Sequence, residues 1–514
     1  MTTLRLLVMA PLPIEAWALG PGKSPRVRTV SFRVERTGMG LVKAAEAAAR
    51  LSAGAARLPG THPGFSAAVL TGLGGDLSGR HEPGHIVVAD RIIDSHGEEV
   101  ARLPAAALAG EIGRLGLTVR TGTVVSADHI VTGAERAELA RSGAEVVDME
   151  SSAIARARWG VPLAVVRAIS DAPGHELFSP AGAMGVWKGL RSLRATRPAL
   201  AAWAAASGPK EVLLAEPRSF CAGVRRAIET VERAIHRYGP PVYVRRQIVH
   251  NAHVVAHLEE SGAIFVDELD EVPDGARVVF SAHGVGTAVR EEATRRGMPT
   301  IDATCPLVTK VHNEARRFAA AGRQVVLVGH AHHDEVEGTL GVVPGIRLVS
   351  TAEDVECLDV DRALPAAFVT QTTLATDDVA DVIGALARRF PDLARPAASD
   401  ICYASQNRQD AVRKIAPECD LVLVVGSANS SNSNRLVEVA RRCGARAHLV
   451  DSAADLRLSW LAGTRRVGVT AGASAPEQLV SEVMEWLAGT GPISVEERST
   501  GNEHVVFQLP PEVR

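Results

Sequence analysis

Three cysteines that stand far apart in the chain have a residue type and a setting that suit metal binding. Cys221, Cys305 and Cys402 each lie between an apolar run and an amphipathic helical pattern. A helix dipole favours thiolate over thiol at the helix N-terminus. The wide spacing excludes CxxC zinc ribbons and ferredoxin-type runs. It suits three similar α/β units around a common centre, so we expect the three cysteines to bind one iron–sulfur cluster.

Spacing alone leaves a second interpretation open, because free cysteines are often small buried apolar residues. We expect Cys357, Cys419 and Cys443 to be of that kind. A 4Fe-4S cluster normally takes four thiolates, so three ligands would leave one iron free to bind substrate as a Lewis acid.

Polar loops also follow other apolar runs in the part of the chain that contains these cysteines. In DLVLVVGSANSSNSNRL the polar loop opens a helix, where free backbone N–H groups form an anion site. VVFSAHGVG and QIVHN each place a histidine at a strand end. Together with TAGASAPEQ, these loops supply donors that can surround a diphosphate without lysine or arginine. The donors are His250, His283, Ser430, Ser431, Asn432 and Ser474.

Ser474 also has a structural interpretation. Ser474-Ala-Pro-Glu477 is a capping box with proline just inside the helix. Local sequence leaves capping and ligand binding equally open.

The order and spacing of these segments, with IDATCPLVTKVH, VVLVGHAHHDEVEGTLG and FVTQTTLATDD between them, resemble the LytB-type 4-hydroxy-3-methylbut-2-enyl diphosphate reductase family. This is the last enzyme of the methylerythritol phosphate route to isoprenoids. The resemblance runs from about Glu211 to the C-terminus. It implies a 4Fe-4S cluster on the three cysteines, diphosphate binding by the donors above, and ferredoxin or flavodoxin as electron donor. The implied products are isopentenyl and dimethylallyl diphosphate.

Loss of hydroxide from an allylic alcohol also needs a proton source. The resemblance implies Glu335 as the acid, with His333 and Thr372 completing a relay to the substrate hydroxyl. Shielding from water would raise the pKa of such a carboxyl. Without the resemblance, Asp334, Glu335 and Glu337 would be interpreted as a solvated acidic turn. The family commonly has His-Pro-Glu where this chain has His-Asp-Glu, so we expect a freer, more charged loop.

Residues 1–205 are predicted to form a separate domain from residues 206–514. All six cysteines lie after Gly208, and an Ala-rich helix ends at Ser207-Gly208-Pro209. Apolar runs such as LRLLVMAPL and PLAVVRAIS alternate with helical patterns. The predicted fold is therefore an α/β sandwich fused to a reductase of three similar α/β units around the cluster.

GMGLVKAA, GLGGDL, VVDMESSAIA and VVRAISDA resemble the nucleoside phosphorylase and nucleosidase family over about 170 residues. The resemblance implies that Asp171 protonates a departing purine, that Glu150 binds ribose hydroxyls, and that Glu15 is the acidic residue near the N-terminus. Asp148 stands where nucleosidases usually have glutamate, which puts the substrate in question. Glycines such as Gly72 are expected to let backbone approach a ligand.

Three interpretations of this half stay open. It is an active phosphorylase or nucleosidase, for example of the type that removes adenine from an adenosyl-hopane; a hydrolase of methylthioadenosine-like nucleosides; or a non-catalytic assembly domain. The acidic pair Asp171 and Glu150 favours catalysis. A cluster-bearing redox sensor is the alternative for the C-terminal half, but the helices after the cysteines mix both charges and give no basic recognition helix.

Composition is typical of a cytoplasmic enzyme. The 514 residues carry a formal net charge of -3, which argues against nucleic acid as a main partner. No apolar run reaches the length of a membrane helix. The cysteines form no obvious disulfide framework, which suits a reducing compartment. Aromatic residues make up only 4%, so the cores must be built from Val, Leu, Ile and Ala.

Overall fold

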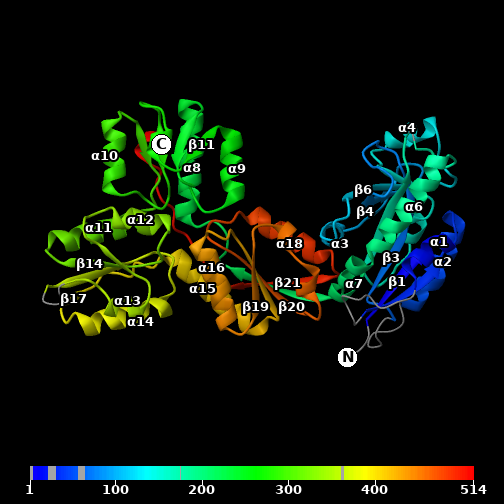
Figure 1. The fold of residues 1–514 in the computed structure, drawn as a ribbon. Coiled ribbons are helices and arrows are strands. Elements are labelled where there is room, and N and C mark those ends of the chain that lie inside the picture. Colours follow the sequence, from blue (N-terminus) through cyan, green and yellow to red (C-terminus); the bar gives the residue numbers. More distant parts are fainter. Residues whose placement is uncertain (1–3, 21–29, 56–63, 174, 361–363) are drawn as a thin grey trace. The chain divides into compact units, whose positions relative to one another are not determined.

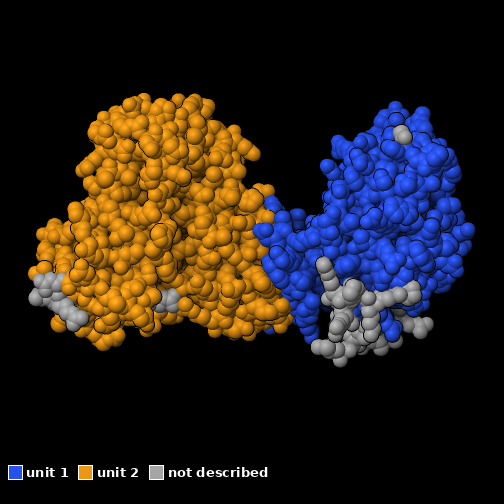
Figure 2. All heavy atoms as spheres, in the orientation of Figure 1, with its two compact units in different colours: residues 1–212, 453–466, 481–495 blue, residues 213–452, 467–480, 496–514 orange. Residues whose placement is uncertain are grey.

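The computed structural model describes residues 4–20, 30–55, 64–173, 175–360 and 364–514. The chain forms two compact units (Figure 2). The first unit comprises residues 1–212, 453–466 and 481–495, and the second comprises residues 213–452, 467–480 and 496–514. The predicted domain boundary between residues 205 and 206 stays a prediction. In the described ranges, no helix is both long enough and apolar enough to cross a membrane.

An eight-stranded mixed sheet organises the first unit (Figure 1). Its strands are β1 (Leu4–Ala10), β2 (Val30–Arg36), β3 (Ala67–Asp76), β4 (Ile86–Ile93), β5 (Glu99–Arg102), β6 (Val119–Ser126), β7 (Val146–Asp148) and β8 (Leu163–Asp171). The path runs β2-β1-β3-β7-β6-β4-β5, and β8 pairs with both β3 and β4. The sheet therefore closes into a ring of β3, β8, β4, β6 and β7.

Helices cover this sheet, as the predicted α/β sandwich requires. They are α1 (Pro13–Leu19), α2 (Leu41–Ala55), α3 (Ala106–Gly113), α4 (Ala134–Ala140), α5 (Ser151–Ala155), α6 (Pro180–Ala195) and α7 (Arg197–Ala206). Helix α6 lies directly on β8 because its inner face is glycine. A Cβ at Gly185 would lie 2.0 Å from the Ser170 carbonyl oxygen, and one at Gly189 would lie 2.7 Å from Leu73.

Three further sheets are each built around parallel strand pairs, which confirms the prediction of three similar α/β units. The first sheet has β10 (Val242–Arg245), β11 (Ala263–Val266), β12 (Val278–Phe280) and β13 (Thr300–Asp302), in the order β11-β10-β12-β13. The second has β14 (Gln324–Val328), β15 (Arg347–Val349), β16 (Ala366–Thr370) and β17 (Leu393–Ala394), in the order β15-β14-β16-β17. The third has β9 (Lys210–Glu216), β18 (Leu421–Val425), β19 (Arg446–Val450), β20 (Arg466–Ala471) and β21 (Ile493–Ser499), in the order β19-β18-β20-β9-β21.

The apolar runs of these strands follow from burial on both faces. In β14, Val326 and Val328 pack toward α14 while Val325 and Leu327 pack toward α11. The helices that follow β9 in the chain are α8 (Ala222–Tyr238), α9 (Ala252–Ser261), α10 (Thr287–Arg295), α11 (Pro306–Ala320), α12 (Asp334–Leu340), α13 (Ala352–Glu356), α14 (Thr376–Arg389), α15 (Tyr403–Ile415), α16 (Ser431–Arg442), α17 (Leu458–Leu461) and α18 (Glu477–Ala488).

The three remaining cysteines differ in burial. Cys419 is buried in the core of the third sheet, and Cys443 is partly buried beside the same core. The expectation of burial is wrong for Cys357, which is exposed because it follows the last residue of the short surface helix α13.

Candidate functional site

Each of the three distant cysteines lies on a connection between two sheets. Cys221 connects β9 of the third sheet to α8 of the first, Cys305 connects β13 to α11, and Cys402 connects β17 to α15. Each occupies the N-cap of the helix that follows it. This agrees with the strand-to-helix pattern of the sequence. Because the chain passes from sheet to sheet at these points, the three thiols reach one central cavity.

This three-cysteine cavity encloses about 110 Å³. Gly223 holds the thiols close together, because a Cβ there would lie 2.6 Å from the Cys305 sulfur. Burial and the neighbouring Cys221 raise the pKa of Cys305 to about 12 and that of Cys402 to about 11. The Cys402 sulfur accepts the backbone N–H of Ser405 at 3.2 Å. Crowded, half-buried thiols with raised pKa values become thiolates only beside a cation, so this donor set fits a cationic metal cluster.

The predicted polar donors come from the carboxyl ends of two adjacent inner strands of each sheet. His250 follows β10, His283 follows β12, His333 and Thr372 follow β14 and β16, and the serine loops follow β18 and β20. Carboxyl ends of parallel strands meet at one edge, where ligands of open α/β sheets bind. All nine predicted reductase-site residues line the three-cysteine cavity with the cysteines, namely His250, His283, His333, Glu335, Thr372, Ser430, Ser431, Asn432 and Ser474.

The three histidines form a compact group of neutral rings. His250 and His283 stack with centroids 4.1 Å apart, and His333 lies edge-on at 5.1 Å from His250. Burial lowers the pKa of His250, lowers that of His333 to about 4, and lowers that of His283 well below its ordinary value. Neutral imidazole offers one N–H donor and one acceptor. The group can therefore hydrogen-bond an anion without first carrying charge.

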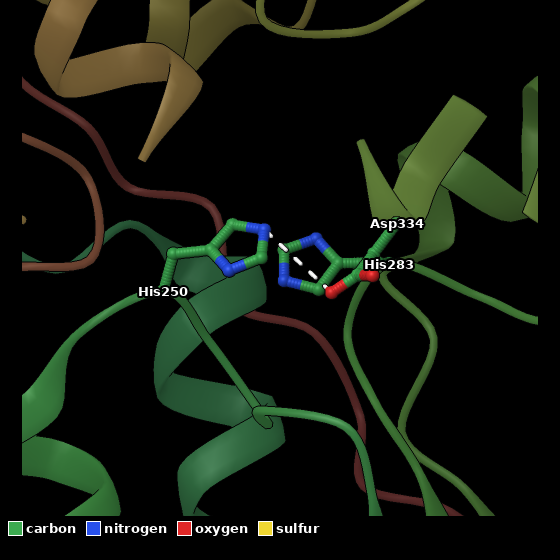
Figure 3. Close-up of side chains that lie close together, drawn as sticks. All are labelled: His250, His283 and Asp334. Carbon is green, nitrogen blue, oxygen red and sulfur yellow. Dashed lines mark ion pairs between the residues drawn. The ribbon is translucent and has the colours of Figure 1, made fainter. Parts of the chain in front are cut away.

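His250, His283 and Asp334 have ligand atoms within 4.8 Å of one another (Figure 3). Such a set resembles a metal site in residue type. The two rings, however, are only 19° from parallel, so their in-plane lone pairs do not converge on one ion. Within the described chain, Nε2 of His250 and of His283 has no hydrogen-bond partner. Two stacked imidazole rings are better placed to bind several oxygens of an extended anion than to bind a single cation.

The serine loop lies at the N-terminus of α16. Ser430 is the N-cap and accepts from Ser433 N–H at 3.4 Å. Asn432 accepts the Ala473 N–H at 3.0 Å and donates to Ser405 at 3.3 Å, so it also joins the loop after β20 to helix α15. The Ser474 hydroxyl donates to the His250 carbonyl at 3.1 Å. Ser474 thus makes a contact across the cavity that helix capping does not explain.

Glu335 is a buried acid at the start of α12, with 3% of its surface exposed. Its carboxylate accepts the Thr372 N–H at 2.6 Å and the Thr372 hydroxyl at 3.0 Å. Burial raises the pKa of Glu335 to about 7, although both Thr372 bonds oppose the shift. Nδ1 of His333 accepts the Glu335 N–H at 3.1 Å, which leaves Nε2 to carry the ring proton. The interpretation as a solvated turn is wrong for Glu335, although Glu337 is exposed.

Asp334 has a partner that the sequence did not reveal. Nη1 of Arg246, just after β10, lies 2.5 Å from Asp334 and 2.6 Å from Glu337. The loop that lacks the family's proline is therefore tied to the first sheet by an ion pair. The second carboxylate oxygen of Asp334 lies 3.9 Å from Nε2 of His250.

A second cavity, in the first unit, is lined by four carboxylates, Glu15, Asp148, Glu150 and Asp171. This carboxylate cavity measures about 230 Å³. The fully buried Arg167 pairs with Asp148 and, at 3.2 Å, with Glu150. Burial raises the pKa of Glu150 to about 7 and also raises that of Glu15. The poorly hydrated acids Glu15 and Glu150 of this cavity thus lie next to the buried cation Arg167. Arg167 belongs to the VVRAISDA motif and could have been found there.

Backbone amides hold Glu15 in place. Its two oxygens accept the N–H groups of Leu73 at 2.8 Å and Leu12 at 2.7 Å. Gly72 makes room for side chains, because a Cβ there would lie 2.4 Å from Arg167 and 3.0 Å from Glu15. This differs from the expected approach of backbone to ligand.

Asp171 is already engaged on both oxygens. One accepts the Ser170 hydroxyl at 2.6 Å, and the other accepts a guanidinium N–H of the buried Arg136. Arg136 lies outside the quoted motifs, and nothing in its local sequence marks it.

Comparisons with known proteins match two different families to two different parts of the chain. Residues 212–488 match the family model described as LytB protein, and residues 26–182 match the phosphorylase superfamily. Over 301 residues, the chain is 59% identical to a 4-hydroxy-3-methylbut-2-enyl diphosphate reductase of Bordetella pertussis, covering 58% of this chain and 93% of the relative. The reductase of Azotobacter vinelandii is 56% identical over 308 residues, covering 59% and 98%. The solved reductase of Plasmodium falciparum is 37% identical with a TM-score of 0.57, covering 60% and 97%.

Proposed function

The chain belongs to the LytB protein family, and from this premise we propose that residues 206–514 act as a 4-hydroxy-3-methylbut-2-enyl diphosphate reductase. The substrate takes up two electrons and two protons, loses its allylic hydroxyl as water, and yields isopentenyl and dimethylallyl diphosphate. One observation carries the proposal above all. The buried acid Glu335 lines the same cavity as three cysteines and a group of neutral hydrogen-bonding side chains.

Cys221, Cys305 and Cys402 would hold a 4Fe-4S cluster. Two observations support this assignment: Gly223 lets the thiols approach one another, and the raised pKa of Cys305 means that its thiolate forms only beside a cation. When bound, the cluster would supply electrons and Lewis acidity to the allylic alcohol. Ferredoxin or flavodoxin would be the electron donor, and the cytoplasm would keep the thiols reduced.

The side chains of the cavity would divide the remaining work. His250, His283 and the serine loop would donate hydrogen bonds to the diphosphate, and the N-terminus of α16 would add its backbone N–H groups. Glu335 would hold the proton for the departing hydroxyl. Thr372, hydrogen-bonded to Glu335 by its hydroxyl, would pass that proton onward, and His333 would orient the substrate through Nε2–H.

Anaerobic iron and sulfide analysis, with electron paramagnetic resonance before and after adding the substrate, tests this function. Turnover is followed with dithionite-reduced methyl viologen, so that no protein donor is needed. We expect a cluster whose signal changes with substrate and whose iron is lost in Cys305→Ser. A cluster whose resonance signal does not change with substrate, in a protein that gives no turnover, would support the redox-sensor alternative instead.

For the first unit we propose cleavage of a purine nucleoside, which the phosphorylase superfamily match supports. Glu150 would bind the ribose hydroxyls, Glu15 would lie beside the sugar, and Asp171 would protonate the departing base. One observation favours the alternative of a non-catalytic role: a base must compete with Arg136 for Asp171. Release of adenine from 5′-methylthioadenosine, with and without phosphate, separates the alternatives. Binding without release would support the non-catalytic role.

A further inference from the structure

A segment near the C-terminus covers one side of the three-cysteine cavity. Residues 501–508 form neither helix nor strand, and we call them the C-terminal strap. Phe507 of the strap lines the cavity together with the three cysteines, whereas the neighbouring Val506 is 88% exposed. At this point a single thickness of backbone therefore separates the cavity from solvent.

The chain just beyond the strap is fixed against the first sheet and α8 (Figure 1). Val513 is buried in the core that α8 shares with β10, and Leu509 packs against that core. The Tyr238 hydroxyl on α8 donates to the Glu512 carbonyl at 2.6 Å. The strap therefore has one end that is held by the core of the first sheet.

Arg408 ties the strap to the loops that carry two of the cysteines. This fully buried residue lies on α15, the helix that Cys402 caps. Its guanidinium forms an ion pair with Glu503 of the strap at 3.0 Å. It also donates to the Ser219 carbonyl at 2.7 Å, two residues before Cys221. A buried guanidinium must satisfy its donors within the protein, so these contacts are costly to break.

Arg226 holds the other end of the strap. It lies near the start of α8, the helix that Cys221 caps. Its Nε donates to the Gln508 carbonyl at 2.7 Å, and its Nη1 donates to the Thr304 carbonyl at 3.0 Å, directly before Cys305. The two arginines therefore hold the strap against the backbone that positions all three thiols.

The strap also borders a pocket of about 320 Å³. Residues 501–505 line this pocket, and Tyr403 lines both the pocket and the three-cysteine cavity. Tyr403 directly follows Cys402 in the chain. A shift of the strap would therefore open a route past the Tyr403 ring to the thiols.

We propose that the C-terminal strap shields the three thiols, and the cluster that they would hold, from oxidants in solution. Phe507 would close the cavity from the side of the strap, while Arg408 and Arg226 would keep the strap from opening. Shielding of the thiols does not require the reductase activity, so the metal-free chain can test it. Shielding of the cluster rests on the proposed function.

Alkylation of the metal-free full chain by iodoacetamide under argon measures access to each thiol. The thiolate displaces iodide and forms a thioether, and peptide mass spectrometry gives a rate for every cysteine. Two other cysteines are internal references, because Cys357 is exposed and Cys419 is buried in the core of the third sheet. We expect Cys221, Cys305 and Cys402 to react more slowly than Cys357 in the native chain.

Glu503→Gln should accelerate alkylation of the three thiols about tenfold or more, because a neutral amide binds the Arg408 guanidinium more weakly than a carboxylate does. Phe507→Ala should also accelerate it by removing the ring that lines the cavity. The matched controls are Glu512→Gln, an exposed acid beyond the strap, and Val506→Ala, whose side chain faces solvent. Neither control should change the rates.

Slow alkylation that neither Glu503→Gln nor Phe507→Ala accelerates would overturn the proposal, and would assign the slow reaction to the raised pKa of Cys305 and Cys402. Equal acceleration at Cys419 would also overturn it, since the substitutions would then unfold the third sheet rather than open the strap.

Loss of iron in air extends the test to the reconstituted chain. Glu503→Gln and Phe507→Ala should lose iron faster than the native chain in air, and no faster under argon. Iron that is lost equally fast under argon would overturn the shielding of the cluster in favour of a role in holding it. If no cluster forms in the native chain, the proposed function fails, while the alkylation rates still decide whether the strap shields the thiols.

Discussion

Replacing Glu335 by glutamine removes the acidic proton and keeps nearly the same side-chain shape. In the native site, Glu335 accepts from both the N–H and the hydroxyl of Thr372. A glutamine carbonyl can still accept the Thr372 N–H. Its amide can donate to the Thr372 hydroxyl, which rotates to accept. The cavity should therefore keep its geometry and lose only the transferable proton.

The size of the effect follows from the burial of Glu335. Its pKa is raised from 4.5 to about 7, a differential of about 3 kcal/mol between its two protonation states. At pH 7 about half of the molecules would carry the proton, against roughly one in three hundred for a carboxyl in water. General acid catalysis contributes about 10²–10⁴-fold. We therefore expect Glu335→Gln to lower kcat by at least about 10²-fold with little change in KM.

Steady-state turnover with reduced methyl viologen measures kcat from about pH 6 to about pH 9, a range that extends to both sides of the raised pKa of Glu335. A raised pKa means that Glu335 is protonated below about pH 7 and loses its proton as pH rises. Native kcat should accordingly fall above pH 7, and the variant should lack that fall. Glu337→Gln, an exposed acid on the same helix, is the control. Near-native kcat in Glu335→Gln with its iron intact, or an equal loss in Glu337→Gln, would refute the assignment.

Three other expectations concern the two cavities. Gly223→Ala should lose cluster iron after anaerobic reconstitution, since its Cβ would lie 2.6 Å from the Cys305 sulfur; Gly384→Ala, whose nearest neighbour would be 3.5 Å away, should retain it, and full iron in both would contradict the reasoning. Asp334→Asn should lower KM for the diphosphate about threefold by removing a nearby negative charge; a raised KM would instead give the Arg246 ion pair the larger role. Asp171→Asn should abolish adenine release while calorimetry still detects nucleoside binding, and release at the native rate would exclude Asp171 as the acid.

Much of the reductase fold could be predicted because its information is local. An apolar run, a polar loop and an amphipathic helix recur around each cysteine, and the N-cap positions of Cys221, Cys305 and Cys402 follow from that pattern. The parallel strands also place their loops at one edge, so residues distant in sequence meet without any further signal. The roles of the individual residues stay predictions.

What could not be predicted depends on pairs that only the tertiary fold brings together. Arg246 meets Asp334 across 88 residues, and Arg136 meets Asp171 across 35. No local periodicity marks either arginine. Gly72 shows a related limit, since glycine can make room for a ligand, a backbone turn or a neighbouring side chain. Here the neighbour is Arg167, whose burial sequence patterns do not reveal.

Burial explains why neutral groups dominate the three-cysteine cavity. The same loss of hydration that raises the pKa of Glu335 lowers those of the three histidines, so the imidazoles are neutral near pH 7 and Glu335 keeps its proton to a higher pH than an ordinary carboxyl. A bound diphosphate would then be the main negative charge in the cavity, and oriented neutral side chains would donate hydrogen bonds to it. Asp334, which lies near His250 but does not line the cavity, has its charge offset by an ion pair with Arg246. The proposed anion site would thus need no cation inside the cavity, and Arg246 is committed to the acidic side chains Glu268, Asp334 and Glu337.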